Sequence, residues 1–149
     1  MALPSGRTIV ITRTFAAPRS VVFDAWTIAK HVAQWWDPGG APLALCEIDL
    51  RPGGEFRFVA ATGPSAQRAF TGSYREIVRP TRLVMVTPGP SPNSESVGTL
   101  VFDEHDGMTT LTLTIESATE ADRDALLRMR VDAGTRQTLE NLADYLRRS

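Results

Sequence analysis

Side chains that could perform acid–base or nucleophilic chemistry are few in this sequence and lie far apart. The chain contains two histidines. His31 stands near the start of a predicted short helix, where we expect it to be exposed, and His105 lies in an Asp-Glu-His-Asp-Gly turn that is typical of a solvated hairpin tip. A Ser/His/Asp triad needs its histidine in the interior of the protein. Neither histidine is therefore well placed for acyl transfer.

No catalytic or metal-binding motif with a recognised spacing is present. The sequence lacks a G-x-S-x-G elbow, a phosphate-binding loop, an H-E-x-x-H pair and a CxxC pair. The turn around His105 lacks the remaining ligands of a calcium loop. The single cysteine, Cys46, lies in an apolar strand pattern, so we expect a buried, unreactive thiol. We predict no metal, no cofactor and no catalytic residue.

The sequence offers instead a set of side chains, most of them large and apolar, that predicted strands and helices would turn inward. We predict that these side chains line an apolar cavity between a sheet and the C-terminal helix, as in most small-molecule sites. They are Trp35, Trp36, Phe56, Phe58, Phe70, Tyr74, Met85, Phe102, Met129 and Thr135. The alternative is that they form a solid core, which is the commoner role of buried aromatic residues.

Arg13, Tyr74 and Glu76 are the candidate polar contacts in that cavity. Strand alternation places Tyr74 and Glu76 on the face of Phe70, and it places Arg13 on the face of Ile11. The alternative for the two charged side chains is that they point past the sheet edge or pair with other charges.

Length and composition limit the number of domains, the kinds of partner and the location that we expect for this protein. The chain has 149 residues, 42% of them hydrophobic, and a formal net charge of −1. One domain over residues 1–149 is expected from this length. A near-neutral charge gives no field that would recruit nucleic acid or an anionic membrane. Without a long apolar run or a disulfide framework, we expect no membrane contact and a cytoplasmic location.

Hydrophobic patterns predict seven strands and three helices. The strands are expected at residues 8–15, 43–50, 55–61, 69–78, 82–86, 97–103 and 108–116, and two short helices are expected at 18–27 and 30–36. The turn Arg51-Pro-Gly-Gly54 predicts a tight hairpin, because its glycines accept positive φ. The loop over residues 87–94 is so polar and proline-rich that we expect it to be mobile and not to pack.

The clearest helix is expected at residues 120–147. Thr119 can cap it, and one face carries an apolar stripe in which Thr135 lies between Val131 and Leu139. Gly134 lowers helix stability by ~1 kcal/mol relative to alanine, so we expect a kink or tight packing near residues 128–134.

The order of these elements resembles the helix-grip fold. Arg13-Thr-Phe-x-Ala-Pro18 and Val22-Phe-Asp-Ala-Trp26 resemble the start of the START-like, or SRPBCC, superfamily. Trp35-Trp36, Glu47-Ile-Asp-Leu-Arg-Pro-Gly-Gly54 and Gly72-Ser-Tyr-Arg-Glu-Ile77 resemble its branch of homologues of the activator of heat-shock-protein-90 ATPase. The resemblance implies an α+β fold in which an antiparallel sheet of about seven strands curves around a long C-terminal helix. Close relatives commonly carry tryptophan where this chain has Thr135, so the smaller side chain leaves volume to fill.

Three functions are compatible with the resemblance. The leading hypothesis is a binding module for an apolar or aromatic small molecule. The second is an enzyme of the cyclase or dehydratase type, in which Tyr74, Glu76 or Arg13 would orient the substrate or move a proton. The third is a co-chaperone-like interaction domain. The chain has no room for the additional domain of the eukaryotic co-chaperone, so we do not expect a heat-shock-protein-90-type chaperone as partner. The sequence leaves open whether the protein forms a homodimer.

Overall fold

The computed structural model describes residues 6–63, 66 and 69–148. The sequence also predicts a turn at Gly63-Pro-Ser65, between the strands expected at 55–61 and 69–78, and this turn lies largely outside the described residues. The elements are β1 (Thr8–Phe15), α1 (Arg19–Thr27), α2 (Ala29–Trp35), β2 (Leu43–Ile48), β3 (Glu55–Ala60), β4 (Phe70–Val78), β5 (Arg82–Pro88), β6 (Glu95–His105), β7 (Met108–Ser117), α3 (Glu120–Arg128) and α4 (Val131–Arg148).

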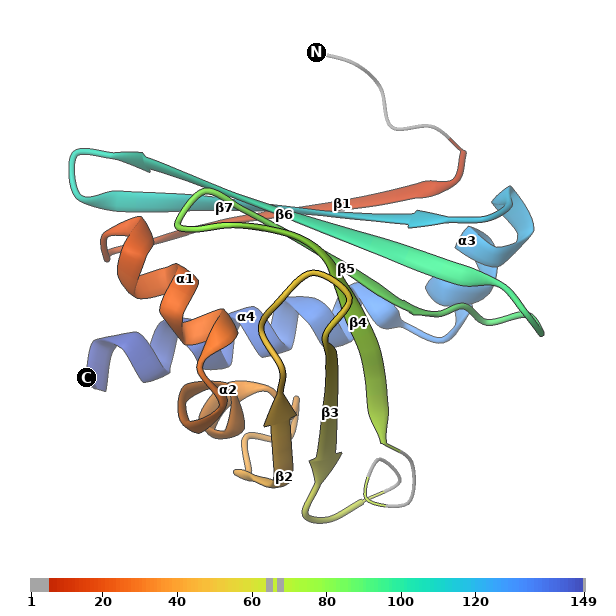
Figure 1. Ribbon diagram of the computed structural model, residues 1–149, viewed down its shortest axis with the longest axis horizontal. Helices are drawn as coiled ribbons and strands as arrows, with labels where there is room; N and C mark the ends of the chain where they lie inside the picture. Colours follow the sequence, from red (N-terminus) through yellow and green to blue (C-terminus); the bar gives the residue numbers. More distant parts are fainter. Residues whose placement is uncertain (1–5, 64–65, 67–68, 149) are drawn as a thin grey trace.

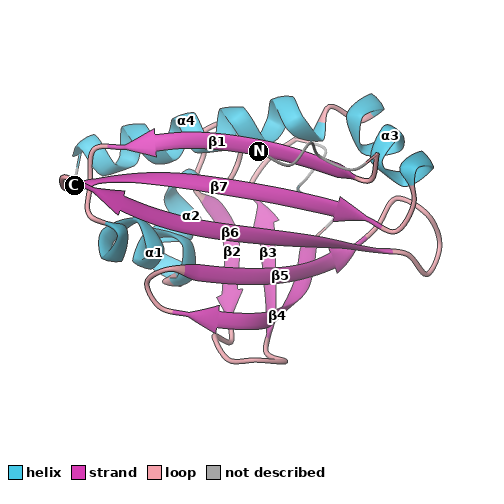
Figure 2. Cartoon of the chain, turned by 90° about the horizontal axis from the view of Figure 1, so that it is seen from above, coloured by secondary structure: helices cyan, strands magenta, loops and turns pink. Residues whose placement is uncertain are grey.

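The seven strands form one antiparallel sheet in the order β1-β7-β6-β5-β4-β3-β2. Its first and last strands are far apart in space, and β2 and β3 run across the direction of β1, β6 and β7 (Figure 1). The long helix α4 and the short helices α1 and α2 lie on the same side of this curved sheet, whereas the other face carries no helix of the described residues (Figures 1 and 2). The predicted helix-grip fold is thus confirmed.

The C-terminal helix is broken rather than kinked. Thr119 caps α3 as expected, accepting a hydrogen bond from the backbone N–H of Asp122 at 3.1 Å. The helix ends because Arg130 takes a left-handed φ of 61°, and α4 starts at the next residue. The break falls in the predicted interval, but Gly134 does not cause it: this glycine lies inside α4, and a Cβ there would meet nothing within 4 Å.

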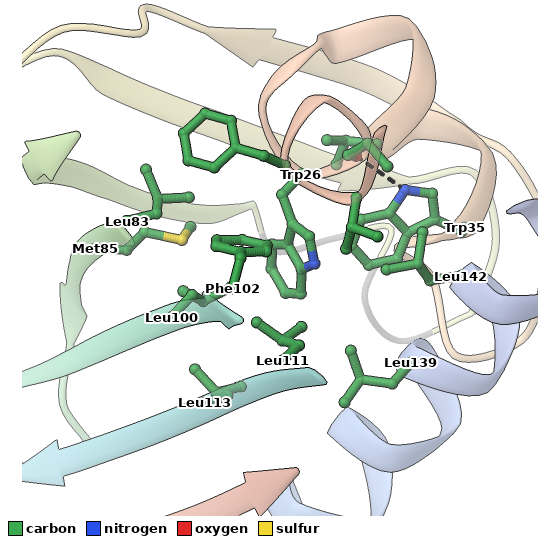
Figure 3. Packing of buried hydrophobic residues seen from close by; sticks show 14 of the residues in the cluster. Trp26, Trp35, Leu83, Met85, Leu100, Phe102, Leu111, Leu113, Leu139 and Leu142 are labelled. Carbon is green, nitrogen blue, oxygen red and sulfur yellow. Dashed lines mark hydrogen bonds between the residues drawn. The ribbon is translucent and has the colours of Figure 1, made fainter. Parts of the chain in front are cut away.

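A tightly packed aliphatic core fills the space between α4, α1 and the strands β1, β6 and β7 (Figure 3). We use the name aliphatic core for five side chains that are at most 2% exposed: Ile11, Leu100, Leu111, Leu139 and Leu142. Each such side chain contributes about 1.5–3 kcal/mol through removal of its apolar surface from water. Two buried polar side chains beside this core have partners: Thr109 Oγ1 donates to the Ala17 carbonyl at 2.7 Å, and Trp35 Nε1 donates to the Ala25 carbonyl at 3.1 Å.

The proline-rich loop between β5 and β6 packs against the helix, contrary to the prediction. Within the loop, the Gly89 N–H donates to the Ser94 carbonyl at 2.8 Å, and the Ser91 N–H donates to Ser94 Oγ at 3.1 Å. The Ser91 hydroxyl also donates to the carboxylate of Asp122, which is 6% exposed on α3. Proline and serine here build a self-bonded turn, because serine side chains replace the backbone partners that a strand would supply.

Candidate functional site

The hairpin between β2 and β3 positions Tyr74 on the neighbouring strand. Its turn has the predicted tight geometry: Gly53 takes a φ of 83°, and the Gly54 N–H donates to the Arg51 carbonyl at 2.8 Å. The same turn is bonded to β4, since the Gly53 N–H donates to the Tyr74 carbonyl at 2.7 Å and the Tyr74 N–H to the Gly54 carbonyl at 2.9 Å. The backbone of Tyr74 is thereby fixed on both sides.

A β-bulge in β4 turns Tyr74 inward and Glu76 outward. Tyr74 pairs with Met85 and Glu76 pairs with Val84, so Arg75 is an extra residue on β4. An inserted residue reverses the alternation of side chains. The prediction that Glu76 shares the face of Tyr74 is therefore wrong. Glu76 pairs with Arg82 at 3.2 Å, and both side chains are more than two-fifths exposed, at 46% and 43%.

Five aromatic side chains gather on the inner face of β3 and β4 beside the end of α2. We call this set the aromatic cluster: Trp36, Phe56, Phe58, Phe70 and Tyr74. Ring centroids are 5.0 Å apart for Trp36 and Phe58, 5.3 Å for Phe56 and Tyr74, and 5.1 Å for Trp36 and Phe70. Such separations are those of favourable tilted and edge-to-face pairs.

Gly72 permits this arrangement of rings. A Cβ at Gly72 would lie 2.5 Å from the ring of Phe56 and 2.5 Å from the carbonyl oxygen of Val86, so only glycine allows β4 to approach both. Phe70, two residues earlier on the strand, stays 40% exposed, whereas Phe56 and Phe58 are almost fully buried at 2% and 3%. Phe70 is thus the side of the aromatic cluster that faces solvent.

The hydroxyl group of Tyr74 is buried in the aromatic cluster without a hydrogen-bond partner among the described residues. The side chain is 1% exposed. Burial, with a smaller contribution from a charge on Cys46, raises the pKa of the Tyr74 hydroxyl well above its ordinary value. Burial also raises the pKa of the half-buried Cys46 thiol, to about 11. Both groups are therefore neutral at physiological pH. Cys46 is half-buried rather than fully buried as predicted, and its low reactivity stays a prediction.

A second buried donor lies next to the aromatic cluster. The indole Nε1 of Trp26, on α1, has no hydrogen-bond partner in the described part of the chain, and the residue is 4% exposed. Its ring packs on Trp35 with a centroid distance of 4.9 Å (Figure 3). It also packs on Trp36, with a centroid distance of 5.7 Å. The hydroxyls of Ser96 and Ser117, a cross-strand pair on β6 and β7, are also buried without a partner. The sequence indicated Trp26 only as part of the motif Val22-Phe-Asp-Ala-Trp26 and gave no sign that its N–H lacks an acceptor.

The other five predicted cavity residues do not lie together. Met85 is 7% exposed opposite Tyr74, and Phe102 packs edge-on against Phe23 of α1 at 5.3 Å. Trp35 is fully buried beside the aliphatic core. Thr135 is half-buried on α4. Met129 is 62% exposed at the break between α3 and α4, so it lies outside the interior, because the break turns this residue to solvent.

Arg13 keeps the predicted face but turns its charge to the surface. Its guanidinium lies 5.9 Å from the centroid of the Phe15 ring and pairs with Glu140 of α4 at 2.5 Å. The Arg13 side chain is 31% exposed and that of Glu140 is 46% exposed. The guanidinium is thus engaged at the edge between β1 and α4, away from the aromatic cluster.

His31 is not exposed, in contrast to the prediction. It is half-buried between α2 and α4, and its Nδ1 lies 2.5 Å from the hydroxyl oxygen of Tyr145. This contact joins the C-terminal part of α4 to α2, which the sequence could have indicated only by placing Tyr145 on the same helical face as Leu142. His105 is exposed in the β6–β7 turn, as predicted.

One cleft of about 870 Å³ opens on the sheet face that carries no helix. Its walls are residues of β2 to β5, the loop between β5 and β6 and the first residue of β6, and the charged side chains among them are Glu47, Glu55, Arg57 and Glu95. Phe56 is the one member of the aromatic cluster that borders it. The cleft is therefore separate from the predicted cavity under α4, which stays a prediction.

The described residues offer neither a metal-ligand cluster nor a membrane-spanning helix. Histidine, cysteine, aspartate and glutamate side chains do not gather there in any group of three that could hold a metal ion. No helix in that part of the chain is long and apolar enough to cross a membrane.

The chain was compared with known families and structures. The sequence model of the family described as Activator of Hsp90 ATPase homolog 1-like protein matches residues 16–147. A protein from Rhodobacter sphaeroides is 25% identical with a TM-score of 0.84, over 97% of this chain and 95% of that one. A protein from Nitrosomonas europaea is 22% identical with a TM-score of 0.84, over 98% and 97%. An HSP90 activator from Plasmodium falciparum is 23% identical with a TM-score of 0.72, over 94% and 96%. No curated protein matches the sequence.

Proposed function

The chain belongs to the family of Activator of Hsp90 ATPase homolog 1-like proteins, and we propose that it is a binding module for an apolar or aromatic small molecule. The site is the aromatic cluster on the inner face of β3 and β4. Ligand sites are mostly apolar with a few polar groups that fix orientation. The aromatic cluster has this composition, since it combines four apolar or amphipathic rings with the hydroxyl group of Tyr74.

The observation that carries the proposal is the open hydroxyl of Tyr74. A buried hydroxyl without a partner costs about 1–3 kcal/mol, and native proteins rarely keep one. Phenylalanine at this position would supply the same packing ring without the hydroxyl group. A ligand that contacts the hydroxyl would satisfy it, and Phe70, 40% exposed, provides the side from which a ligand can reach the rings.

The alternatives have less support in the described residues. A cyclase or dehydratase needs an acid or base beside its substrate, but Arg13 and Glu76 are paired at the surface and His31 contacts Tyr145 away from the rings. The likeness to the Plasmodium falciparum HSP90 activator, at 23% identity, concerns the fold alone and carries no partner to this chain.

A thermal-shift screen of aromatic and fatty-acid libraries tests the proposal. A ligand of the folded state at a hundred times its dissociation constant adds ~2.7 kcal/mol to the free energy of unfolding, so the melting temperature should rise by several degrees. Phe70→Ala should weaken binding of each hit by about 5-fold or more, because it removes a ring contact of about 1 kcal/mol or more.

Leu50→Ala is the matched control, because Leu50 is 41% exposed, nearly the same as Phe70, and lies outside the aromatic cluster. It should bind every hit like the unchanged protein. If no compound shifts the melting temperature, or if hits bind Phe70→Ala and Leu50→Ala equally well, the aromatic cluster is a solid core and the proposal is wrong.

A further inference from the structure

Resting on the site proposed above, we infer that its ligand is an uncharged molecule whose polar group accepts hydrogen bonds, such as a ketone, ester or ether, and not a carboxylic acid.

Two buried groups beside the rings can donate a hydrogen bond and have no acceptor. The indole N–H of Trp26 is a donor only, whereas the hydroxyl of Tyr74 can donate or accept. Burial raises the pKa of Tyr74, so the hydroxyl keeps its proton and its ability to donate. The Trp36 ring lies against Trp26 at 5.7 Å and against Phe58 at 5.0 Å, and Tyr74 packs on Phe56 at 5.3 Å, so the two donors border different rings of the aromatic cluster. A ligand on the aromatic cluster is complementary when it brings an acceptor.

The interior offers no positive charge to pair with an anion. No lysine, arginine or histidine is buried among the described residues, and Arg13, the cation on the inner sheet face, is committed to Glu140 at the edge of α4. A carboxylate moved from water into an apolar site without a counter-ion is strongly disfavoured. The one charged side chain that is buried in the described part is itself acidic: Asp122 on α3, 6% exposed and bonded to Ser91.

The neutral state of the nearby thiol completes this environment. Burial raises the pKa of Cys46 to about 11, so the thiol stays protonated at neutral pH. Cys46 shares the inner face with Phe58, its cross-strand partner on β3. The site thus combines neutral donors with aromatic rings, which is a match for a weakly polar carbonyl or ether compound.

Three probes with the same ring system and nearly the same size test the inference. They are 2-acetylnaphthalene, which carries a ketone, 2-ethylnaphthalene, which carries no polar group, and 2-naphthoate, which is anionic at neutral pH. Dissociation constants are measured by titration calorimetry at pH near 7. The ketone should bind at least ~10-fold more tightly than naphthoate and about 2- to 10-fold more tightly than the ethyl compound, as expected for one net hydrogen bond.

The variant Tyr74→Phe removes only the hydroxyl and locates the effect. It should reduce the affinity for the ketone to that for the ethyl compound and leave the latter unchanged. Naphthoate binding as tightly as the ketone would overturn the inference while leaving the site in place. If none of the three probes binds, the proposed site itself is contradicted and the inference fails with it.

Discussion

The aliphatic core and the aromatic cluster lie on the same inner face of the sheet, yet they are built differently. In the aliphatic core, every side chain is at most 2% exposed, and nearby buried polar groups such as Thr109 and the Trp35 indole donate to backbone carbonyls. In the aromatic cluster, Phe70 is 40% exposed and the hydroxyl of Tyr74 has no partner in the described residues. The contrast separates a region whose buried side chains stabilise the fold from the region that we propose as the ligand site.

The position of α4 explains the contrast. This helix contacts α2, α3 and β1, so its leucines cover the β1 side of the sheet. The inner face of β3 and β4 is covered by the end of α2 and by its own aromatic rings. Stability and ligand binding can therefore be changed separately by substitutions in the two regions.

The largest effect is expected in the aliphatic core. Leu139→Ala, at a residue 1% exposed, should lower the free energy of unfolding by about 2–5 kcal/mol, because it removes buried methyl groups and leaves a cavity. Leu127→Ala is the matched control: Leu127 is 39% exposed on α3, so its loss should change stability by no more than about 0.5 kcal/mol. Urea unfolding measures both. Equal effects would show that the core under α4 is loosely packed.

A smaller effect is expected where α4 passes towards the aromatic cluster. Thr135 is half-buried, and if space beside it is empty, Thr135→Trp should leave stability unchanged or raise it by about 1 kcal/mol, while reducing ligand affinity. If neighbouring side chains already fill that space, the added ring overpacks the core and costs ~1–3 kcal/mol. A loss of more than about 2 kcal/mol in urea unfolding would therefore exclude unfilled space at this position.

The ion pair at the edge of α4 should contribute less. Arg13→Ala removes a pair in which both side chains are partly exposed, so the expected loss is about 0–1 kcal/mol, and high salt should reduce it. Glu140→Ala and the double variant complete a double-mutant cycle by urea unfolding. Because the guanidinium lies away from the aromatic cluster, ligand affinity should not change. A clear loss of ligand binding in Arg13→Ala would show that Arg13 contributes to the ligand site.

The smallest effect is confined to alkaline pH. Burial raises the pKa of the Cys46 thiol from 9.0 to about 11, so the folded protein holds this proton more tightly than the unfolded chain. The stabilising contribution is complete below pH 9 and is lost as pH rises towards 11. Urea unfolding of Cys46→Ala should therefore show a shallower decline of stability over this range than the unchanged protein. Parallel declines would show that the thiol is solvated.

Much of the fold follows from local sequence patterns. Alternation defines all seven strands to within about two residues of their observed ends, and Thr119 and the Arg51-Pro-Gly-Gly54 turn act as their chemistry predicts. Pro18, expected as the first residue of a helix, instead precedes α1 with an extended backbone. The resemblance to the helix-grip fold supplied the sheet curvature, which periodicity alone does not contain. The break in the C-terminal helix was placed correctly, but its cause, the left-handed Arg130, is an arginine whose sequence gives no turn signal.

The details of the site were less predictable, because they depend on a single inserted residue and on tertiary partners. The bulge at Arg75 reverses the strand alternation after Tyr74, and no residue type marks it. Arg13 and His31 find partners on α4, more than a hundred residues away in the chain, which local reasoning cannot identify. The aromatic cluster was foreseen as a set of residues, whereas the exposure of Met129 and the open N–H of Trp26 were not.

The most direct test of the contrast between the two regions is the stability of Tyr74→Phe without ligand, measured by urea unfolding. The substitution keeps the ring and removes only the hydroxyl. Because that hydroxyl is buried without a partner, its removal should leave the free energy of unfolding unchanged or raise it by about 1 kcal/mol. A decrease of more than about 1 kcal/mol would show that the hydroxyl stabilises the fold through a hydrogen bond, and that the aromatic cluster is as fully satisfied as the aliphatic core.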